Sequence, residues 1–308
     1  MRAIDRLIHA IEEKANPTVL GLDTRYDYLP DAADLSSEAD WQRVAAEKMW
    51  AYNKAILDAL VDIVPAVKIQ IAYYEMCGLW GMKLFHRCCE YAAKQGYFVI
   101  ADAKRGDIGP TAGAYATAFL GTHSVGGQDM SAFPCDMLTV NPYFGSDGIL
   151  PFVEECGKND RGVFVLVKTS NPSSGEFQDL LLENGQPLYA RVAEKVAEWG
   201  QSSIGEHGYS DVGAVVGATY PSQGRALRQA HPELFFLVPG YGAQGATADD
   251  LADCFDAEGR GALVNASRSL LLAYRKQEGV NWIEATQNEA LRMKEDLNRA
   301  IAKRRSAK

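Results

Sequence analysis

The chain has 308 residues, of which 47% are hydrophobic, and its formal net charge is −9. This acidity argues against nucleic acid or an anionic membrane as a partner, and no apolar run approaches the roughly 18 residues of a membrane span. The amino terminus resembles an amphipathic helix more than a signal peptide, and the six cysteines form no C-x-x-C pair. We therefore expect a cytoplasmic protein with reduced thiols.

Strand and helix patterns alternate along the chain. Short apolar runs predict strands at 18–23, 64–70, 98–104, 137–141, 162–170, 212–217, 234–239 and 262–265. Helical periodicity is found at 2–14, 39–62, 75–95, 110–121 and 187–203, and in a tail at 282–308. The loop 171–187 begins with Asn-Pro-Ser-Ser-Gly and is interpreted as a mobile lid.

Strands that alternate with helices pair in parallel through right-handed crossovers. Eight such units in about 270 residues fit a (β/α)8 barrel, a TIM barrel of the α/β class, better than a doubly wound sheet, which more often has five or six strands. No break in composition suggests a linker. We therefore predict a single domain over 1–308, with the barrel at about 15–275 and a C-terminal helix at about 282–303.

Charged residues mark the ends of three predicted strands. Asp102 and Lys104 share one face of the run that begins at Phe98, and Asp107 follows after a glycine turn. Asp23 ends the first strand and Lys68 lies near the end of the second. Barrel enzymes have their active sites at the carboxyl ends of the strands, so we expect these charges to meet. An ordinary surface ion-pair cluster is the alternative, but the strand at 98 is too apolar for an edge.

Two segments after the last strands are typical of phosphate binding. The sequence Pro-Gly-Tyr-Gly-Ala-Gln-Gly follows the seventh strand at 239–245, and Arg268 follows the eighth. Barrels frequently bind phosphate with glycine-rich backbone at these two loops, and arginine suits a phosphate dianion. The five histidines are scattered without a pair at metal-ligand spacing, and no serine-nucleophile elbow, P-loop or dinucleotide motif is present. We therefore expect no cofactor and no metal, with lysine as the acid or electrophile.

The charged and glycine-rich motifs resemble those of one known family. Asp102-Ala103-Lys104-Arg105-Gly106-Asp107-Ile108 is similar to the Asp-x-Lys-x-x-Asp-Ile signature of the orotidine 5′-phosphate decarboxylases, in their longer bacterial-type branch. The segment 239–245 resembles the phosphate loop of that family. The resemblance implies decarboxylation of orotidine 5′-monophosphate (OMP) to UMP without a cofactor, in the last step of de novo pyrimidine synthesis.

The resemblance also implies catalytic roles and a shared site. Lys104 would protonate C6 of the pyrimidine, and Asp102 would lie beside the departing carboxylate and orient Lys104. Asp107 and Thr111 would come from the other subunit of a homodimer. Lys68 would join the charge array.

The remaining matched residues would bind the substrate. Asp23 and Lys68 would bind the ribose hydroxyls, and Ser170 would meet the pyrimidine ring. Gln244 and Arg268 would hold the phosphate. The family's shorter members continue His-Pro-Gly after this serine, where this chain has Asn171-Pro172-Ser173.

Three other functions are compatible with some of these features. A Schiff-base aldolase would use a neutral lysine, either Lys104 or Lys168, whereas the neighbouring carboxylates favour a charged one. A sugar-phosphate decarboxylase of the same superfamily would share the Asp-x-Lys-x-x-Asp pattern but require Mg²⁺. A non-catalytic barrel would bind a phosphorylated ligand without turnover.

Overall fold

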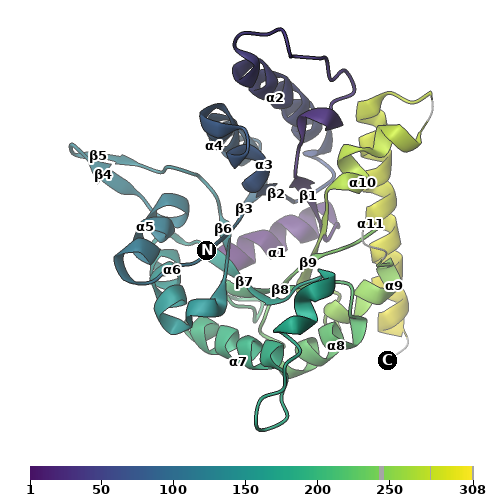
Figure 1. The fold of residues 1–308 in the computed structure, drawn as a ribbon. Coiled ribbons are helices and arrows are strands. Elements are labelled where there is room, and N and C mark those ends of the chain that lie inside the picture. The colour runs from purple at the N-terminus through teal and green to yellow at the C-terminus, as the bar shows by residue number, and fades with distance from the viewer. Residues whose placement is uncertain (243–245, 278, 307–308) are drawn as a thin grey trace.

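The protein folds around a closed barrel of eight parallel strands, as the strand–helix alternation predicted (Figure 1). The computed structural model describes residues 1–242, 246–277 and 279–306. Around the barrel the strands follow the order β1-β10-β9-β8-β7-β6-β3-β2, so neighbours in the chain are neighbours in space. The barrel strands are β1 (Thr18–Leu22), β2 (Ala66–Gln70), β3 (Phe98–Arg105), β6 (Met137–Val140), β7 (Gly162–Lys168), β8 (Val212–Val216), β9 (Phe236–Pro239) and β10 (Ala262–Ala266).

The strand boundaries differ from the predicted ones by a few residues, for local reasons. β2 begins after Pro65, which has no N–H to give to a ladder. β9 begins after a turn in which the Leu234 N–H donates to the carbonyl of His231. β7 ends at Lys168 because the next N–H, that of Thr169, donates to the Gln178 side chain.

Helices surround the barrel and cover the outer faces of its strands (Figure 1). Their long members agree with the predicted helical segments, and α6 and α8 complete the ring. The helices are α1 (Ala3–Lys14), α2 (Trp41–Leu60), α3 (Ala72–Glu75), α4 (Gly78–Lys94), α5 (Gly109–Leu120), α6 (Ser146–Asn159), α7 (Leu188–Gly200), α8 (Pro221–Ala230), α9 (Ala248–Leu251), α10 (Arg268–Leu271) and α11 (Trp282–Ser306).

Helix α1 closes the amino-terminal end of the barrel. Its residues Ile4 and Leu7 are fully buried and belong to one cluster with Phe164 and Phe235, which come from barrel strands or their approaches. Burying side chains of this size contributes about 1.5–3 kcal/mol each. Apolar side chains of the described residues therefore fill the amino-terminal half of the barrel, and the cavity that they leave lies toward the carboxyl ends of the strands.

Helix α11, the predicted C-terminal helix, packs beside α2 and α9 and reaches the end of α1. The Lys294 ammonium donates to the carbonyl of Lys14 (2.8 Å), and the Asn298 amide donates to that of Ala15 (2.9 Å). A small antiparallel hairpin of β4 (His123–Val125) and β5 (Gln128–Met130), which the sequence patterns did not indicate, projects from the barrel (Figure 1).

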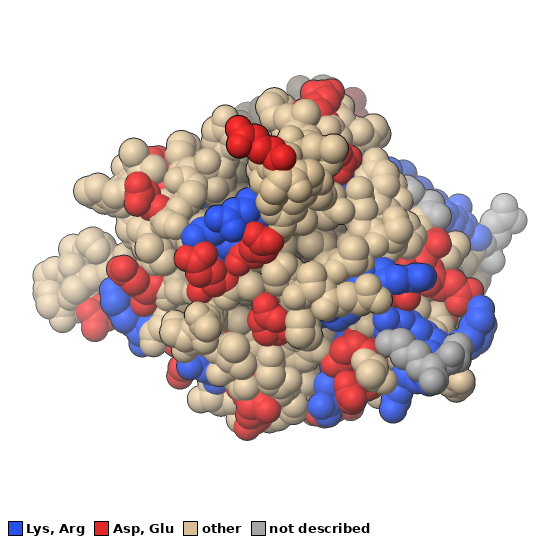
Figure 2. Space-filling model, turned by 90° about the horizontal axis from the view of Figure 1, so that it is seen from below, with Lys and Arg blue, Asp and Glu red and all other residues tan. Residues whose placement is uncertain are grey.

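The surface and the thiols agree with the composition. On the face shown in Figure 2, Lys and Arg side chains lie among Asp and Glu side chains. All six cysteines are free thiols, and five of them are buried. Within the described ranges, no helix is both long and apolar enough to span a membrane.

Candidate active site

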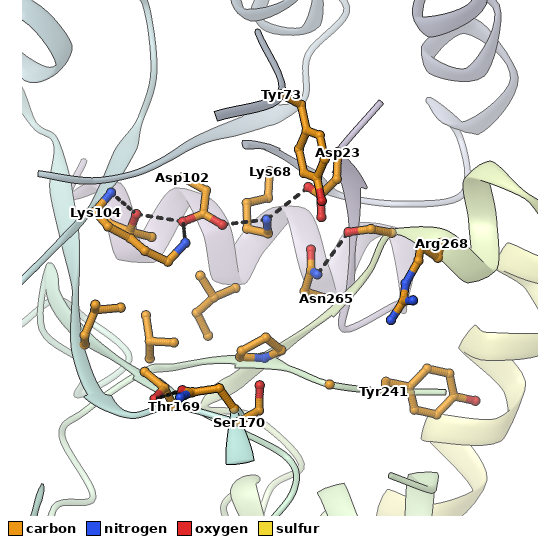
Figure 3. Close-up of a pocket in the computed structure, with 18 of the residues that line it drawn as sticks. Asp23, Lys68, Tyr73, Asp102, Lys104, Thr169, Ser170, Tyr241, Asn265 and Arg268 are labelled. Atoms are coloured by element: carbon orange, nitrogen blue, oxygen red, sulfur yellow. Dashed lines mark hydrogen bonds and ion pairs between the residues drawn. The ribbon is translucent and has the colours of Figure 1, made fainter. Parts of the chain in front are cut away.

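A cavity of about 660 Å³ opens at the carboxyl ends of the strands (Figure 3). This volume lies within the range of pockets for small-molecule ligands. Eight of the nine site residues predicted from the sequence lie within the described ranges. Six of these eight line the cavity: Asp23, Lys68, Asp102, Lys104, Ser170 and Arg268. The predicted charges at the strand ends therefore do meet in one place.

Asp102 is the centre of the charged group. Its Oδ2 accepts hydrogen bonds from the Lys68 ammonium at 2.7 Å and from the Gln70 amide at 2.9 Å. Its Oδ1 accepts from the Lys104 ammonium at 2.6 Å and from the Thr139 hydroxyl at 2.9 Å. Four donors thus hold one buried carboxylate and fix the orientation of both lysines.

The four charges form an alternating row, Asp23–Lys68–Asp102–Lys104 (Figure 3). Lys68 Nζ is 3.5 Å from Asp23 Oδ1, and its side chain is only 5% exposed. Burial disfavours the charged forms of Lys68 and Asp102, but the attraction between opposite charges outweighs it. The carboxylates raise the pKa of Lys68 above its usual value, and the two lysines hold the pKa of Asp102 well below its own. Both side chains are therefore ionised at neutral pH.

Lys104 differs from Lys68 in backbone and exposure. Its φ is +46°, in the left-handed region that side chains other than glycine rarely adopt, and the β3–β6 register shifts between Ala101 and Arg105. The Lys104 N–H donates to the Thr139 hydroxyl (2.9 Å), which holds the chain in this bend. The Lys104 side chain is 45% exposed. A strained backbone thus directs this ammonium into open space, where a ligand can meet it.

The other end of the cavity is formed by the segments after β9 and β10. Gly240, Tyr241 and Arg268 line this end, where the sequence predicts phosphate binding. The predicted Gln244 lies outside the described residues. Tyr241 donates its hydroxyl hydrogen to Asp296 of α11 (2.6 Å), so the C-terminal helix anchors this loop. Close packing also requires Gly21 in β1, because a Cβ there would lie 1.9 Å from the Ser267 hydroxyl.

Ser170 lies on the wall formed by the end of β7. Gly217 makes room for it, since a Cβ on Gly217 would lie within 2.9 Å of Ser170 atoms.

Lys168, the alternative lysine for an aldolase, does not line the cavity. Its ammonium is buried and binds Asp179 Oδ1 (2.8 Å) and the Ser174 hydroxyl (3.1 Å) in the segment predicted to be a lid. That segment is thus tied to the barrel by a buried charge.

Asp107 and Thr111 do not line the cavity of their own chain. Asp107 follows the end of β3, where one of its carboxylate oxygens accepts a hydrogen bond from the Ile108 N–H (2.8 Å). Thr111, near the start of α5, is exposed. These two residues are therefore available to a neighbouring subunit, and their role there remains a prediction.

The sequence patterns missed several residues of the cavity. Gln70 and Thr139 bind Asp102, and Tyr73 and Asn265 line the walls (Figure 3). The alternation that placed Lys68 on the inner face also places Gln70 there, two residues later in β2, and the same rule applied to β6 would have found Thr139 after Met137. Tyr73 lies in the short helix α3, where no such periodicity is available.

The fold and the site together define a class of protein: a (β/α)8-barrel enzyme with a buried carboxylate–ammonium row facing a cationic loop site. The sequence identifies the family within this class. Residues 31–281 match the model of the orotidine 5′-phosphate decarboxylase / HUMPS family, and the chain belongs to that family.

Individual relatives agree with this membership. The chain is 41% identical to an orotidine 5′-phosphate decarboxylase of Caldicellulosiruptor bescii, over 97% of this chain and 98% of the relative. It is 44% identical to one of Rhodopirellula baltica, over 94% and 96%. The crystal structure of a candidate orotidine 5′-phosphate decarboxylase from Streptomyces avermitilis superposes with a TM-score of 0.79 at 30% identity, over 98% of this chain and 96% of the other.

Proposed function

We propose that this protein decarboxylates OMP to UMP and carbon dioxide, the last step of de novo pyrimidine synthesis, without a metal or organic cofactor. The observation that carries this proposal is the row of four alternating charges at one end of a cavity whose other end presents Arg268. OMP has a carboxylate on its ring and a phosphate at the far end of its ribose, and this distribution of charge matches the cavity. Membership of the family supports the same reaction.

The proposed chemical step uses Lys104 as the acid. The bond between C6 and the carboxylate breaks, its electron pair stays on C6, and carbon dioxide leaves. The Lys104 ammonium then gives a proton to C6 and becomes a neutral amine, which water reprotonates after the reaction. Charges that are fixed before the reaction stabilise the developing carbanion without the cost of reorienting solvent. The 2.6 Å contact with Asp102 supports this role because it fixes the lysine in advance.

The remaining residues would bind the parts of OMP that do not react. Asp23 and Lys68 would bind the ribose hydroxyls, Ser170 the pyrimidine ring, and Arg268 with Gln244 the phosphate. Binding energy from the phosphate, far from C6, can be used to orient the ring for the reaction. The position of Asp23 and Lys68 in the charge row, with Arg268 at the other end of the cavity, supports this order of contacts.

A homodimer with shared sites is part of the proposal. Asp107 and Thr111 would enter the partner's cavity and complete the charge row. Exposed apolar side chains near Asp107 support this arrangement, since Ile108 is 54% and Phe144 is 50% exposed, and a Cβ on Gly106 would lie 3.7 Å from the Phe144 ring. Exposed apolar patches of this kind mark protein–protein contacts.

Two broader expectations complete the proposal. The whole chain would act as one domain, since α11 anchors both the end of α1 and the loop at Tyr241.

The protein would work in the cytoplasm, where its six free thiols would stay reduced.

The direct test follows the absorbance of OMP after mixing with EDTA-treated protein. We expect conversion to UMP by the wild type and loss of nearly all turnover in Lys104→Ala. Lys168→Ala is the matched control, because that lysine lies outside the cavity, and it should keep most of its kcat. Normal turnover by Lys104→Ala would remove this lysine as the proton donor. Dependence on Mg²⁺ would favour the sugar-phosphate decarboxylase, and a borohydride-trapped adduct on Lys104 would favour the aldolase.

The shared site is tested by mixing two inactive variants, Lys104→Ala and Asp107→Ala, under conditions of subunit exchange. Half of the dimers are then mixed, and each mixed dimer has one intact site. We expect about a quarter of the wild-type activity to return. Exchange verified by mass spectrometry without any recovery would refute the shared site, while leaving the reaction itself unaffected.

A further inference from the structure

Three side chains with metal-binding atoms meet at the amino-terminal end of the barrel, at the end opposite the charged cavity. They are His9 in α1, and Glu206 and His207 in the turn before β8. Glu206 Oε1 lies 3.0 Å from His9 Nε2 and 3.7 Å from His207 Nε2, and the three ligand atoms all lie within 4.8 Å of one another. The two imidazole rings stand edge to face, with centroids 5.1 Å apart. Nearly two hundred residues separate the two histidines in sequence, which is why spacing did not reveal the group.

The backbone that carries Glu206 and His207 is a closed turn. The Gly205 N–H donates to the carbonyl of Tyr209 (2.7 Å), and the Gly208 N–H donates to that of Gly205 (3.1 Å). Gly208 has a φ of +80°, which glycine adopts without strain. The positions of the two ligand residues are therefore set by the main chain and not by flexible side chains alone.

The turn is also docked on α1, which carries the third ligand. The His207 N–H points to Asp5 Oδ1 (3.4 Å), and Asp5 itself is buried. A Cβ on Gly205 would lie 2.4 Å from the Asp5 carboxylate, so glycine is needed for this approach. The helix and the turn thus have a fixed relative position before any ligand binds.

The chemistry of this group matches a divalent transition cation. Two imidazole nitrogens and one carboxylate oxygen form a ligand set found in zinc sites. Metal–ligand bonds of about 2.0–2.2 Å at tetrahedral angles separate ligand atoms by roughly 3.3–3.5 Å, close to the two distances from Glu206 Oε1. His207 Nε2 is buried, and among the described residues it has no hydrogen-bond partner. An acceptor atom held in this way lacks the interaction that a cation would supply.

We propose that His9, Glu206 and His207 bind one Zn²⁺-like ion and thereby fasten α1 to the barrel. The ion would keep at least one position for water, since three protein ligands are present. The buried Asp5 carboxylate nearby adds favourable negative charge. The site is independent of OMP turnover, because α1 and this turn lie at the end of the barrel away from the cavity.

The test uses protein without a histidine tag, stripped with EDTA and dialysed, and then titrated with Zn²⁺ or with Co²⁺ as a spectroscopic probe. We expect one ion per chain, a visible Co²⁺ absorption of a four-coordinate site, and a rise in Tm of about 3–6 °C with Zn²⁺. His9→Gln and His207→Gln should each weaken binding by at least about tenfold and abolish the rise in Tm.

The matched control is His231→Gln. His231 lies 3.5 Å from Glu233, and this pair is not part of the His9–Glu206–His207 group. The variant should therefore bind Zn²⁺ like the wild type. His9 is 43% exposed, so we expect His9→Gln to fold like the wild type, and the test does not depend on the folding of His207→Gln. Absence of stoichiometric binding would overturn the proposal, as would equal affinities of wild type and His9→Gln. OMP turnover, measured on the same preparations, should not change.

Discussion

Thr139 offers a sharp test of how the charged row is positioned. Its hydroxyl accepts a hydrogen bond from the Lys104 N–H and donates one to Asp102 Oδ1, at 2.9 Å each. The side chain is 1% exposed. Thr139→Val keeps the shape and removes both bonds, so any change in catalysis reports on positioning and not on a lost cavity wall.

The two hydrogen bonds lost in Thr139→Val set the size of the expected effect. Loss of a hydrogen bond to the ionised Asp102 costs about 1.5–3 kcal/mol, and the Lys104 N–H left without an acceptor adds about 1–3 kcal/mol. Together the two losses lower the free energy of unfolding by about 2.5–6 kcal/mol. Misplacement of the Lys104 ammonium is a separate effect on catalysis, and about 1.4–2.8 kcal/mol of lost transition-state stabilisation corresponds to about a ten- to hundredfold lower kcat.

The assay is steady-state OMP turnover together with urea unfolding. We expect Thr139→Val to lower kcat with little change in KM, because both bonds of the hydroxyl are made within the protein. Thr139→Ser keeps the hydroxyl and should retain most of the activity. Thr169→Val is a suitable control, since Thr169 lines the same cavity but bonds to Asn171 at the rim. A wild-type kcat in Thr139→Val would refute the positioning role.

Three other predictions concern charge and burial. Burial raises the pKa of Asp102, but Lys68 and Lys104 together outweigh burial and lower this pKa. The ionised carboxylate therefore stabilises the fold above about pH 4 and stabilises it less as the pH falls further. In urea unfolding, the stability difference between wild type and Asp102→Asn should therefore be largest at pH 7 and shrink toward pH 3; a constant difference would contradict the assignment. Among the described residues, the buried Arg228 donates only to backbone carbonyls, including that of Gly261 (2.6 Å). Arg228→Lys should therefore lower the free energy of unfolding by about 3 kcal/mol with unchanged KM, whereas the exposed Arg225→Lys should lower it by about 0.5 kcal/mol. Asp179→Ala removes the ionic partner of the buried Lys168 and should raise KM for OMP and lower the free energy of unfolding by about 1–3 kcal/mol. If KM and the free energy of unfolding both stay at their wild-type values, this ion pair does not hold the 172–187 segment in place.

The barrel could be predicted because its strands are buried on both faces, so their sequences are short, mainly apolar runs. β8, with Val212–Val216, is such a run. The hairpin at His123–Met130 could not be predicted in the same way, since its six strand residues are exposed and have no apolar periodicity. Secondary structure without a buried face leaves little pattern in the sequence.

The site was predictable to the extent that charge interrupts an apolar strand. Asp102 and Lys68 stood out because an ionised side chain in such a run is costly unless it is paired. Thr139 gave no such signal, because a threonine fits a strand whether or not its hydroxyl has a special partner. The left-handed φ of Lys104 was also hidden, since only the contacts of the folded chain hold a lysine in that conformation.

The closure of the barrel by α1 has a consequence for how the reaction products leave the cavity. Because Ile4, Leu7 and Phe235 pack together at the amino-terminal end of the barrel, the described residues close the cavity at that end. In the proposed reaction, carbon dioxide forms beside the charged row. It would leave toward the carboxyl ends of the strands, past the bound nucleotide. Carbon dioxide is small, whereas UMP would also have to give up the phosphate contacts proposed for Arg268. In the proposed reaction, closure of the barrel at its amino-terminal end therefore favours departure of carbon dioxide before UMP.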